Sequence, residues 1–302
     1  MAMTDLSAPR PRTDRAAFAL SALAAVFWGT NFEATHLALA SLPPWSAAGL
    51  RFAIAGAAIL GWLALAQGIR GDVLRRNLAA FVALGIIGVA GFNAALFVGL
   101  QTSSPVTGAL IMATSPLTTT LIASGLDRRA PSRRVLAGLV VSLIGVALTI
   151  GAFRGVPLGQ GDLLILGGSL VWALYTIGCR RWIRDATPLE TSAWTMAFGA
   201  LALIGAALTL DHPLAAIAAA TPLSLGAVVY MAIVGSVLAY LFWQTGIAVR
   251  GPGPTSVLFN LVPVAALGVA AALGTMPSAD RILGVAIAIL GVMLASPRPA
   301  RH

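Results

Sequence analysis

The chain has 302 residues, of which 58% are hydrophobic and only 10% are charged, and its mean hydropathy is +0.91. These values lie outside the range of soluble globular domains and predict an integral membrane protein. The net charge of +9 comes from arginines, because the chain has no lysine. Basic loops beside anionic lipid explain this charge, so we expect no nucleic-acid partner.

Ten long apolar runs follow one another along the chain, and each can cross about 30 Å of hydrocarbon as a helix. Backbone polar groups in lipid must pair internally, so helices are expected rather than irregular segments. Residues 1–15 and 297–302 are expected to be disordered cytoplasmic tails. The predicted spans are residues 16–37, 45–66, 78–100, 104–124, 134–152, 161–179, 188–209, 222–246, 253–273 and 279–296.

Arginines concentrate in every second gap between these runs. Clusters precede the first span and follow the second, fourth and sixth, and further arginines follow the eighth and tenth. The opposite-side gaps hold only Arg154 and Arg281, and Arg51 lies inside a span. Basic residues stay cytoplasmic, so we predict a multi-pass protein of the inner or plasma membrane with both termini in the cytoplasm.

The sequence also indicates that the chain consists of two repeats that arose by duplication. Residues 16–152 and 161–296 form two repeats of five spans, and because five is odd the second repeat enters the membrane from the opposite side. The prediction is an all-α integral membrane protein in which two inverted five-helix repeats surround a central cavity, as in secondary transporters. Three landmarks of the first repeat recur 147 positions later: Gly88 as Gly235, Pro105 as Pro252, and Pro116 as Pro263.

Several motifs resemble the ten-helix EamA type of the drug/metabolite transporter superfamily. The resemblance covers residues 16–296 and implies a basket-like bundle, with a cavity lined by spans 1, 3, 4, 6, 8 and 9, that moves small metabolites, amino acids or drugs, commonly outward. The chain departs from the family at the end of span 4, where Asp127 stands near the usual Glu. The motifs are Trp28-Gly29-Thr30-Asn31-Phe32, Leu50-Arg51-Phe52, Thr107-Gly108-Ala109-Leu110, Ser115-Pro116-Leu117 and Gly138-Leu139 with Ile144-Gly145-Val146.

Polar and aromatic side chains inside the spans are the candidates for a substrate site. Trp28 and Trp172 should lie roughly 15–18 Å deep, near the midplane. Each shares a helix face with polar residues. Such a face suits the wall of a substrate cavity. The alternative is that these polar side chains bond neighbouring helices and serve helix packing. Pro116 and Pro263 are expected to kink their helices. The substrate-binding candidates are Trp28, Asn31, Asn93, Trp172, Tyr175, Tyr240, Gln244 and Asn260.

Glu33 and Arg51 are the one carboxylate and the one guanidinium placed well inside the predicted spans. Their expected depths match, and isolated charges in a membrane are costly, so we expect them to pair. Such a pair would fasten spans 1 and 2 or an external gate. The alternatives are proton coupling through Glu33 and capture of a substrate carboxylate by Arg51.

The missing motifs narrow the chemistry. Without lysine there is no P-loop, the three histidines are scattered, and no GxSxG motif is present. We therefore expect no catalytic residue, no cofactor and no metal site. A secondary carrier remains the favoured class, with a membrane-embedded enzyme or a structural subunit as a distant alternative.

Within carriers, phosphorylated substrates need several deep cations, and only Arg51 is available. Trp, Tyr and Asn suit a neutral or zwitterionic substrate. The favoured function is export of amino acids, aromatic or large and apolar, by alternating access, as in the similar YddG-type aromatic amino-acid exporters. The alternative is an exporter of hydrophobic drugs or organic cations. The expected partners are a small-molecule substrate and the bilayer, and the oligomeric state stays open, a monomer included.

Overall fold

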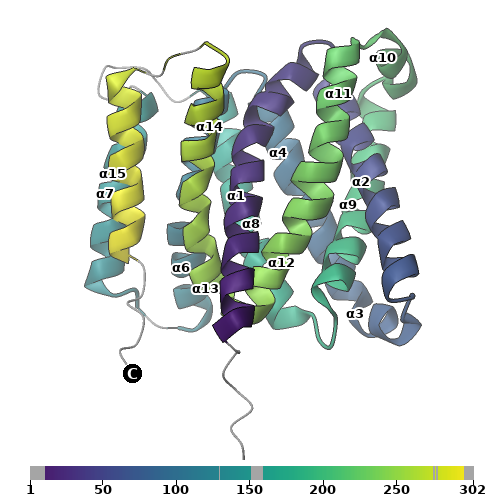
Figure 1. The fold of residues 1–302 in the computed structure, drawn as a ribbon, viewed down its shortest axis with the longest axis horizontal. Helices are drawn as coiled ribbons and strands as arrows, with labels where there is room; N and C mark the ends of the chain where they lie inside the picture. Colours follow the sequence, from purple (N-terminus) through teal and green to yellow (C-terminus); the bar gives the residue numbers. More distant parts are fainter. Residues whose placement is uncertain (1–10, 129, 151–158, 275, 277, 296–302) are drawn as a thin grey trace, which may run out of the picture.

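The computed structural model describes residues 11–128, 130–150, 159–274, 276 and 278–295, and its regular structure there is helical throughout, without strands. The helices lie side by side with their axes roughly parallel (Figure 1). They are α1 (Pro11–Leu39), α2 (Pro44–Ala66), α3 (Gly71–Ala83), the π-helical η1 (Leu84–Gly91), α4 (Phe92–Gly99), α5 (Pro105–Ala113), α6 (Ser115–Leu126), α7 (Arg133–Ile150), α8 (Gln160–Trp182), α9 (Pro188–Leu210), α10 (Pro213–Ala219), α11 (Pro222–Tyr230), the π-helical η3 (Met231–Leu238), α12 (Ala239–Arg250), α13 (Pro252–Ser256), the 3₁₀-helical η4 (Val257–Asn260), α14 (Leu261–Ala272) and α15 (Ala279–Ala295).

Seven helical segments in the described part of the chain are long and apolar enough to cross a membrane. The described residues of the remaining ranges expected to span, at α1, α7 and α15, are helical as well. The expectation of an all-helical membrane protein is thus confirmed. The seven are Pro44–Ala66, Gly71–Gly99, Pro105–Leu126, Gln160–Trp182, Pro188–Leu210, Pro222–Arg250 and Pro252–Ala272.

The first helix begins earlier than expected. α1 starts at Pro11, so residues 11–15, expected as part of a disordered tail, are helical. Proline suits the first helical turn, and Asp14 places a carboxylate near the positive end of the helix dipole. Asp14 also accepts a hydrogen bond from Arg250 Nε at 3.1 Å. Residues 1–10 and 297–302, together with Arg154, lie outside the described residues.

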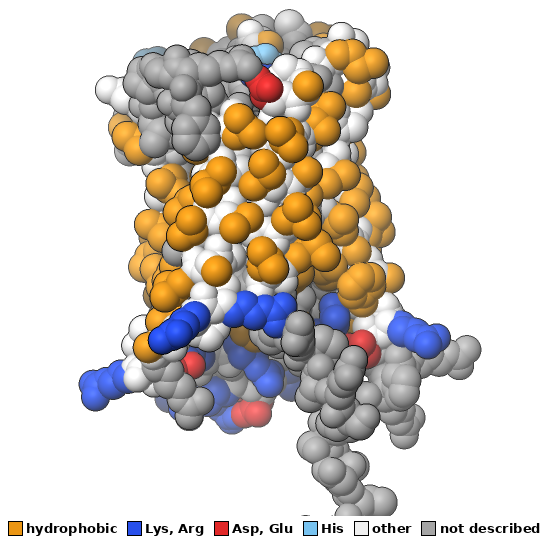
Figure 2. Space-filling view, turned by 90° about the vertical axis from the view of Figure 1, so that its left-hand side faces the viewer, with side chains coloured by type: hydrophobic (Ala, Val, Ile, Leu, Met, Phe, Trp, Pro, Cys, Tyr) orange, Lys and Arg blue, Asp and Glu red, His pale blue; other side chains and the backbone are white. Residues whose placement is uncertain are grey.

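Arginines gather at one end of the bundle, which we call the arginine-rich end. Figure 2 shows them below a broad band of hydrophobic side chains on the face formed by α7 and α15. The start of α1 and the end of α15 lie at this end, whereas α10 lies at the opposite end (Figure 1). The apolar band is what contact with hydrocarbon requires, and the arginines mark one of its borders.

Helices from the first half of the chain pack against helices from the second half in matched pairs. α2 packs along α9, and α7 packs along α15. α1 packs on α12, and α4 packs on α8 in the corresponding way. Small residues allow the close approach of α7 and α15, because a side chain at Gly145 would overlap the backbone of α15 at Ala288.

Four irregular segments interrupt the helices near the middle of the bundle. The run from α5 to α6 breaks at Thr114, two residues before Pro116, and the 3₁₀ turn η4 ends three residues before Pro263. The π-helical segments η1 and η3 each have eight residues and start at Leu84 and Met231. Such segments leave backbone carbonyls free for other partners, and π-helical turns are frequent at functional sites.

Candidate functional site

A small cavity lies in the centre of the bundle, where α1, α2, α4, α5, α8, α12 and η4 meet. Its free volume is about 20 Å³, room for roughly one water molecule. Aromatic and apolar side chains form most of the wall, and three polar groups interrupt it. The lining residues are Trp28, Asn31, Phe32, Arg51, Phe92, Asn93, Leu96, Met112, Trp172, Tyr240 and Phe259.

Trp28 is the centre of an aromatic cluster that fills this region. Its ring stacks on Phe259 with 5.3 Å between ring centroids and meets Trp172 edge-on at 5.2 Å. Tyr240 and Trp243 approach the same ring edge-on at 5.8 and 5.1 Å. Such offset and edge-on arrangements are the favoured aromatic geometries, so the cluster forms a rigid apolar wall.

Arg51 enters the cavity from α2 and is only 2% exposed. Its Nε donates to Ser236 Oγ at 2.9 Å, whereas its Nη1 and Nη2 make longer hydrogen bonds, to Asn93 Oδ1 at 3.3 Å and to the Gly235 carbonyl at 3.4 Å. The guanidinium carbon also lies 5.0 Å from the Phe52 ring centroid. Every one of these partners is neutral, and within the described residues no carboxylate pairs with Arg51.

The π-helical segment η3 supplies part of this polar wall. The Gly235 carbonyl accepts a hydrogen bond from Trp28 Nε1 at 2.9 Å in addition to that from Arg51. A π-helical segment makes such a carbonyl available, and the lack of a side chain at Gly235 lets the Asn31 amide pack against the backbone. Ser236 in the same segment holds the Arg51 Nε.

Several buried polar atoms around the cavity lack hydrogen-bond partners among the described residues. They are Asn31 Nδ2 and Oδ1, the indole nitrogens of Trp172 and Trp243, and Asn260 Oδ1. Buried polar groups in proteins are nearly always bonded, and an unpaired one costs about 1–3 kcal/mol. Asn31 and Trp172 line the cavity itself, so a polar molecule there could satisfy both.

A polar layer separates the central cavity from a second pocket nearer the arginine-rich end. Gln244 Nε2 donates to Tyr175 OH at 2.9 Å and to Cys179 Sγ at 3.3 Å. The second pocket has a volume of about 150 Å³, and both Cys179 and Gln244 lie in its wall. Trp172 and Cys179 are seven residues apart on one face of α8, so the two hollows follow the same helix face.

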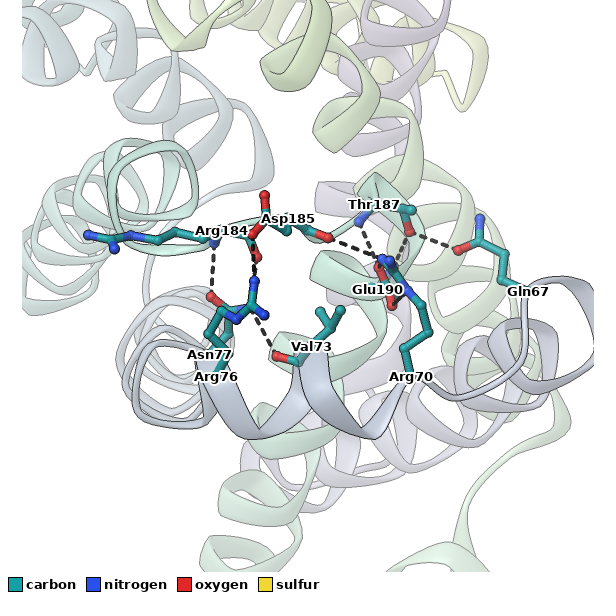
Figure 3. Close-up of polar contacts among 9 residues, drawn as sticks. All are labelled: Gln67, Arg70, Val73, Arg76, Asn77, Arg184, Asp185, Thr187 and Glu190. Carbon is teal, nitrogen blue, oxygen red and sulfur yellow. Dashed lines mark hydrogen bonds and ion pairs between the residues drawn. The ribbon is translucent and has the colours of Figure 1, made fainter.

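Beneath this second pocket, Arg70 and Glu190 join the loop before α3 to the start of α9 (Figure 3). Arg70 donates to both carboxylate oxygens of Glu190, with its Nε at 2.8 Å, and its Nη2 also reaches the Asp185 carbonyl at 3.1 Å. Glu190 caps α9 through the Thr187 backbone N–H at 2.8 Å. Hydrogen bonding to Glu190 raises the pKa of the Arg70 guanidinium above its ordinary value.

Asn77 and Arg76 on α3 contact the loop between α8 and α9 (Figure 3). The Asn77 side-chain oxygen accepts a hydrogen bond from the Arg184 backbone N–H at 2.8 Å, and the Asn77 side-chain nitrogen donates one to the Arg184 carbonyl at 2.9 Å. The side chain thus satisfies both backbone polar groups of Arg184. Arg76 pairs with Asp185 at 2.6 Å. We call the set the arginine-end network; it comprises Gln67, Arg70, Arg76, Asn77, Arg184, Asp185, Thr187 and Glu190.

The expected ion pair between Glu33 and Arg51 does not form in the described residues, and this expectation is wrong. Arg51 points into the central cavity, whereas Glu33 lies in a separate groove with Thr30 and Tyr230. The expectation rested on equal depth, but depth does not fix the direction in which a side chain leaves its helix. On α1, Glu33 points away from the face that carries Trp28 and Asn31.

The other candidate residues divide into three groups. Trp28, Asn31, Asn93, Trp172 and Tyr240 meet at the central cavity. Tyr175 and Gln244 form the polar layer beside it, and Asn260 is buried next to the lining residue Phe259. Sequence reasoning missed Phe259, Trp243 and Ser236. Trp243 could have been found, because it follows Tyr240 by three residues on one helix face.

Comparisons with known proteins agree with this architecture. The EamA-like transporter family matches residues 15–151 and, a second time, residues 159–296. A solved crystal structure shares the fold, with a TM-score of 0.70 and 22% identity over 93% of this chain and 96% of that chain.

Curated relatives cover most of the chain. An uncharacterized transporter of Bacillus subtilis, YyaM, is 38% identical over 90% of both chains. A probable terminal-alkyne amino-acid exporter of Streptantibioticus cattleyicolor is 26% identical over 91% of this chain and 92% of its own. A probable amino-acid metabolite efflux pump of Salmonella typhimurium is 24% identical over 91% and 93%. With a family match over nearly its whole length, this chain belongs to the EamA-like transporter family of the drug/metabolite transporter superfamily and is a membrane transporter.

Proposed function

We propose that this transporter exports amino acids with aromatic or other large apolar side chains. The observation that carries the proposal is the buried Arg51, which has only neutral partners in the described part of the chain. A buried cation without a counter-charge is costly, and a substrate carboxylate would provide that charge. A guanidinium binds a carboxylate through two parallel hydrogen bonds, and the two long bonds of Arg51 are the ones a substrate would replace.

The remainder of an amino acid also finds matching groups. The unpaired Asn31 Oδ1 can accept from an α-ammonium group, and the faces of Trp28 and Trp172 attract a cation. Phe92, Leu96 and Met112 offer apolar contact to a large side chain. Two distant relatives, one named a probable terminal-alkyne amino-acid exporter and the other a probable amino-acid metabolite efflux pump, support this substrate class.

The geometry disfavours the alternative of an organic-cation exporter. Glu33, the carboxylate that such a substrate would require, lies outside the central cavity. The charge that does reach the cavity, Arg51, repels a cation. A lipophilic cation without a carboxylate would therefore leave Arg51 unpaired.

Transport requires the helices around the cavity to move apart. A free volume of about 20 Å³ is far below the several hundred Å³ of typical ligand sites. Alternating access satisfies this requirement, because two repeats that rock against each other open the cavity to one side at a time. The repeats would be residues 16–152 and 161–296, each with five spans, and the second repeat would be inverted in the membrane relative to the first.

Three observations support that arrangement. The family matches the chain twice, once in each half. The packing of α1 on α12 corresponds to the packing of α8 on α4, as exchange of the two halves demands. The π-helical segments η1 and η3 start 147 residues apart, the spacing of the glycine and proline landmarks.

The arginine-end network would then be the cytoplasmic gate. The excess of arginine at this end supports a cytoplasmic location for it and, with it, for both termini. Because the network ties the first half of the chain at Arg70 and Asn77 to the second half at Glu190 and Arg184, it must open before substrate can enter from that side.

Counterflow tests the proposal. Vesicles containing the purified protein are loaded with Trp, Phe, Met or Thr, or with an organic cation, and receive labelled substrate outside without an ion gradient. Uptake of labelled Trp or Phe, exceeding that in protein-free vesicles, is expected. Uptake of the organic cation alone would indicate a drug exporter instead of an amino-acid exporter. If folded protein takes up none of these compounds, the amino-acid assignment is wrong.

A further inference from the structure

A groove on the outside of α1 holds Glu33, the one carboxylate that lies well inside the predicted spans. It runs between α1, α11 and α14 and has a volume of about 420 Å³. Its polar groups are Thr30, Glu33 and Tyr230, and the remaining wall is aliphatic. Neither the central cavity nor the arginine-end network includes any of these three residues.

The groove is separate from the central cavity because the two occupy opposite faces of α1. At about 100° per residue, Trp28 and Asn31 share one face, whereas Glu33 and Leu37 lie on the other. Tyr230 and Leu223 on α11 are exposed at the surface of the bundle, so the groove opens sideways. In a membrane, a groove that opens sideways opens onto lipid.

Glu33 lies close to the border of the hydrocarbon core. α1 has 29 residues and is therefore about 44 Å long, roughly 14 Å more than the hydrocarbon core. If this excess is shared equally, each end projects about 7 Å, and Glu33 lies six residues, about 9 Å, before Leu39. The Glu33 carboxylate thus lies at the border of the hydrocarbon, on the side opposite the arginine-rich end.

The groups in the groove favour a positively charged hydrogen-bond donor. Glu33 has no ion-pair partner among the described residues. Thr30 Oγ1 and Tyr230 OH are within hydrogen-bond distance of each other, at 2.5 Å, and form a polar patch in the same groove. A primary ammonium group bonds a carboxylate directly, whereas a quaternary ammonium group has no N–H to donate.

We propose that this groove binds an aminophospholipid such as phosphatidylethanolamine, with its ammonium group on Glu33 and an acyl chain along the aliphatic walls of α11 and α14. The Tyr230 hydroxyl, which lies beside Thr30 and so deeper in the membrane than Glu33, would bond an ester carbonyl of the lipid. The volume and the lateral opening suit a headgroup with the first part of one chain. The site is distinct from the proposed amino-acid site and does not depend on the identity of the transported substrate.

Native mass spectrometry of the purified full chain tests the site. The protein is exchanged into mixtures of phosphatidylethanolamine with its N-methyl, N,N-dimethyl and N,N,N-trimethyl forms, the last being phosphatidylcholine. One tightly held lipid is expected, with retention falling by about tenfold from the primary to the quaternary amine, the change that one charge-assisted hydrogen bond predicts. Equal retention of all four lipids by the unmodified protein would overturn the proposal.

Substitutions locate the site. Glu33→Gln should abolish the preference for the primary amine, and Tyr230→Phe should weaken retention of all four lipids. Asp72→Asn removes the same charge at the arginine-rich end and should change neither. Persistence of the preference in Glu33→Gln would place the lipid elsewhere. Tighter binding of dodecylamine than of phosphatidylethanolamine, together with its transport into vesicles, would make the groove a substrate site and overturn the lipid assignment.

Discussion

Asn93 and Tyr240 are separated by 147 residues in the chain, yet the Asn93 amide donates a hydrogen bond to the Tyr240 hydroxyl at 3.3 Å in the wall of the central cavity. The separation equals the offset of the landmark glycines and prolines, so each residue is the counterpart of the other in the proposed repeats. Asn93 also accepts from Arg51, and Tyr240 therefore helps to orient the guanidinium through Asn93.

Tyr240→Phe removes this support without changing the shape of the cavity. We expect the apparent affinity for the transported amino acid to fall about threefold to tenfold, the effect of one buried hydrogen bond, with little change in maximal rate. Counterflow at a series of substrate concentrations measures both quantities. Thr209→Val removes a hydroxyl that bonds only carbonyls of its own helix, α9, outside the cavity, and should leave transport unchanged. If Tyr240→Phe changes transport no more than this control does, the Tyr240 hydroxyl does not orient Arg51, and Tyr240 acts by packing alone.

Arg51→Met separates a functional arginine from a structural one. A methionine of similar length removes a buried charge that has only neutral partners, so the melting temperature should stay the same or rise. Counterflow of amino acids should fall by about 10- to 100-fold, because charged hydrogen bonds contribute about 1.5–3 kcal/mol.

Amino-acid amides provide the matching control for Arg51→Met. They lack the carboxylate, so the substitution should reduce their weak transport far less. A large fall in melting temperature together with equal loss of acids and amides would show that Arg51 mainly stabilises the fold.

Glu190→Gln should loosen the arginine-end network. The variant keeps the hydrogen bond that caps α9, since Gln also accepts from the Thr187 N–H, but loses the ionic bond to Arg70. Cys179 is the sole cysteine of the chain and lies in the wall of the pocket above the network, so a maleimide reports its opening. We expect labelling to be about five to ten times faster than in the unmodified protein.

Asp72→Asn serves as the control for that experiment. The substitution removes the same charge as Glu190→Gln, but at an exposed position on α3. Its labelling rate should match that of the unmodified protein. If Glu190→Gln is labelled no faster, the network does not close the pocket.

Gly235→Ala tests the close approach between α1 and η3. A methyl group at Gly235 would overlap the Asn31 amide, and the surrounding core must shift. We expect a loss of about 1–3 kcal/mol in stability and impaired transport. Gly205→Ala, which meets nothing within 4 Å, should be neutral or slightly stabilising. Thermal unfolding followed by tryptophan fluorescence compares the two, and similar melting temperatures would contradict the predicted overlap.

Hydropathy predicted the helices because the signal is local: a segment that crosses lipid must be apolar along its whole length. Periodicity on one helix likewise brought Trp28 and Asn31 together, and Trp172 with Tyr175, all of which are buried. The pairing of Glu33 with Arg51 failed because it depended on how two helices are rotated about their axes. No local pattern contains that rotation, which neighbouring helices determine.

The π-helical segments could not be predicted for a similar reason. Residues 84–91 and 231–238 have the composition of ordinary membrane helices, and their glycines are compatible with either helix type. The position of the Gly235 carbonyl, and with it the polar partners of Arg51 and Trp28, follows from this backbone geometry. The aromatic content of the site was therefore visible in the sequence, whereas its hydrogen bonding was not.

The two π-helical segments also determine where the chain can change length. A π-helical turn contains about one residue more than the α-helical turn it replaces, because its hydrogen bonds connect residues five rather than four positions apart. Loss of one residue from Leu84–Gly91 or Met231–Leu238 would restore a regular helix and keep both flanking faces in register. The same loss within α2 or α9 would turn all following side chains by about 100° and expose polar groups to lipid. Natural variation in length within the spans should therefore concentrate at these two segments.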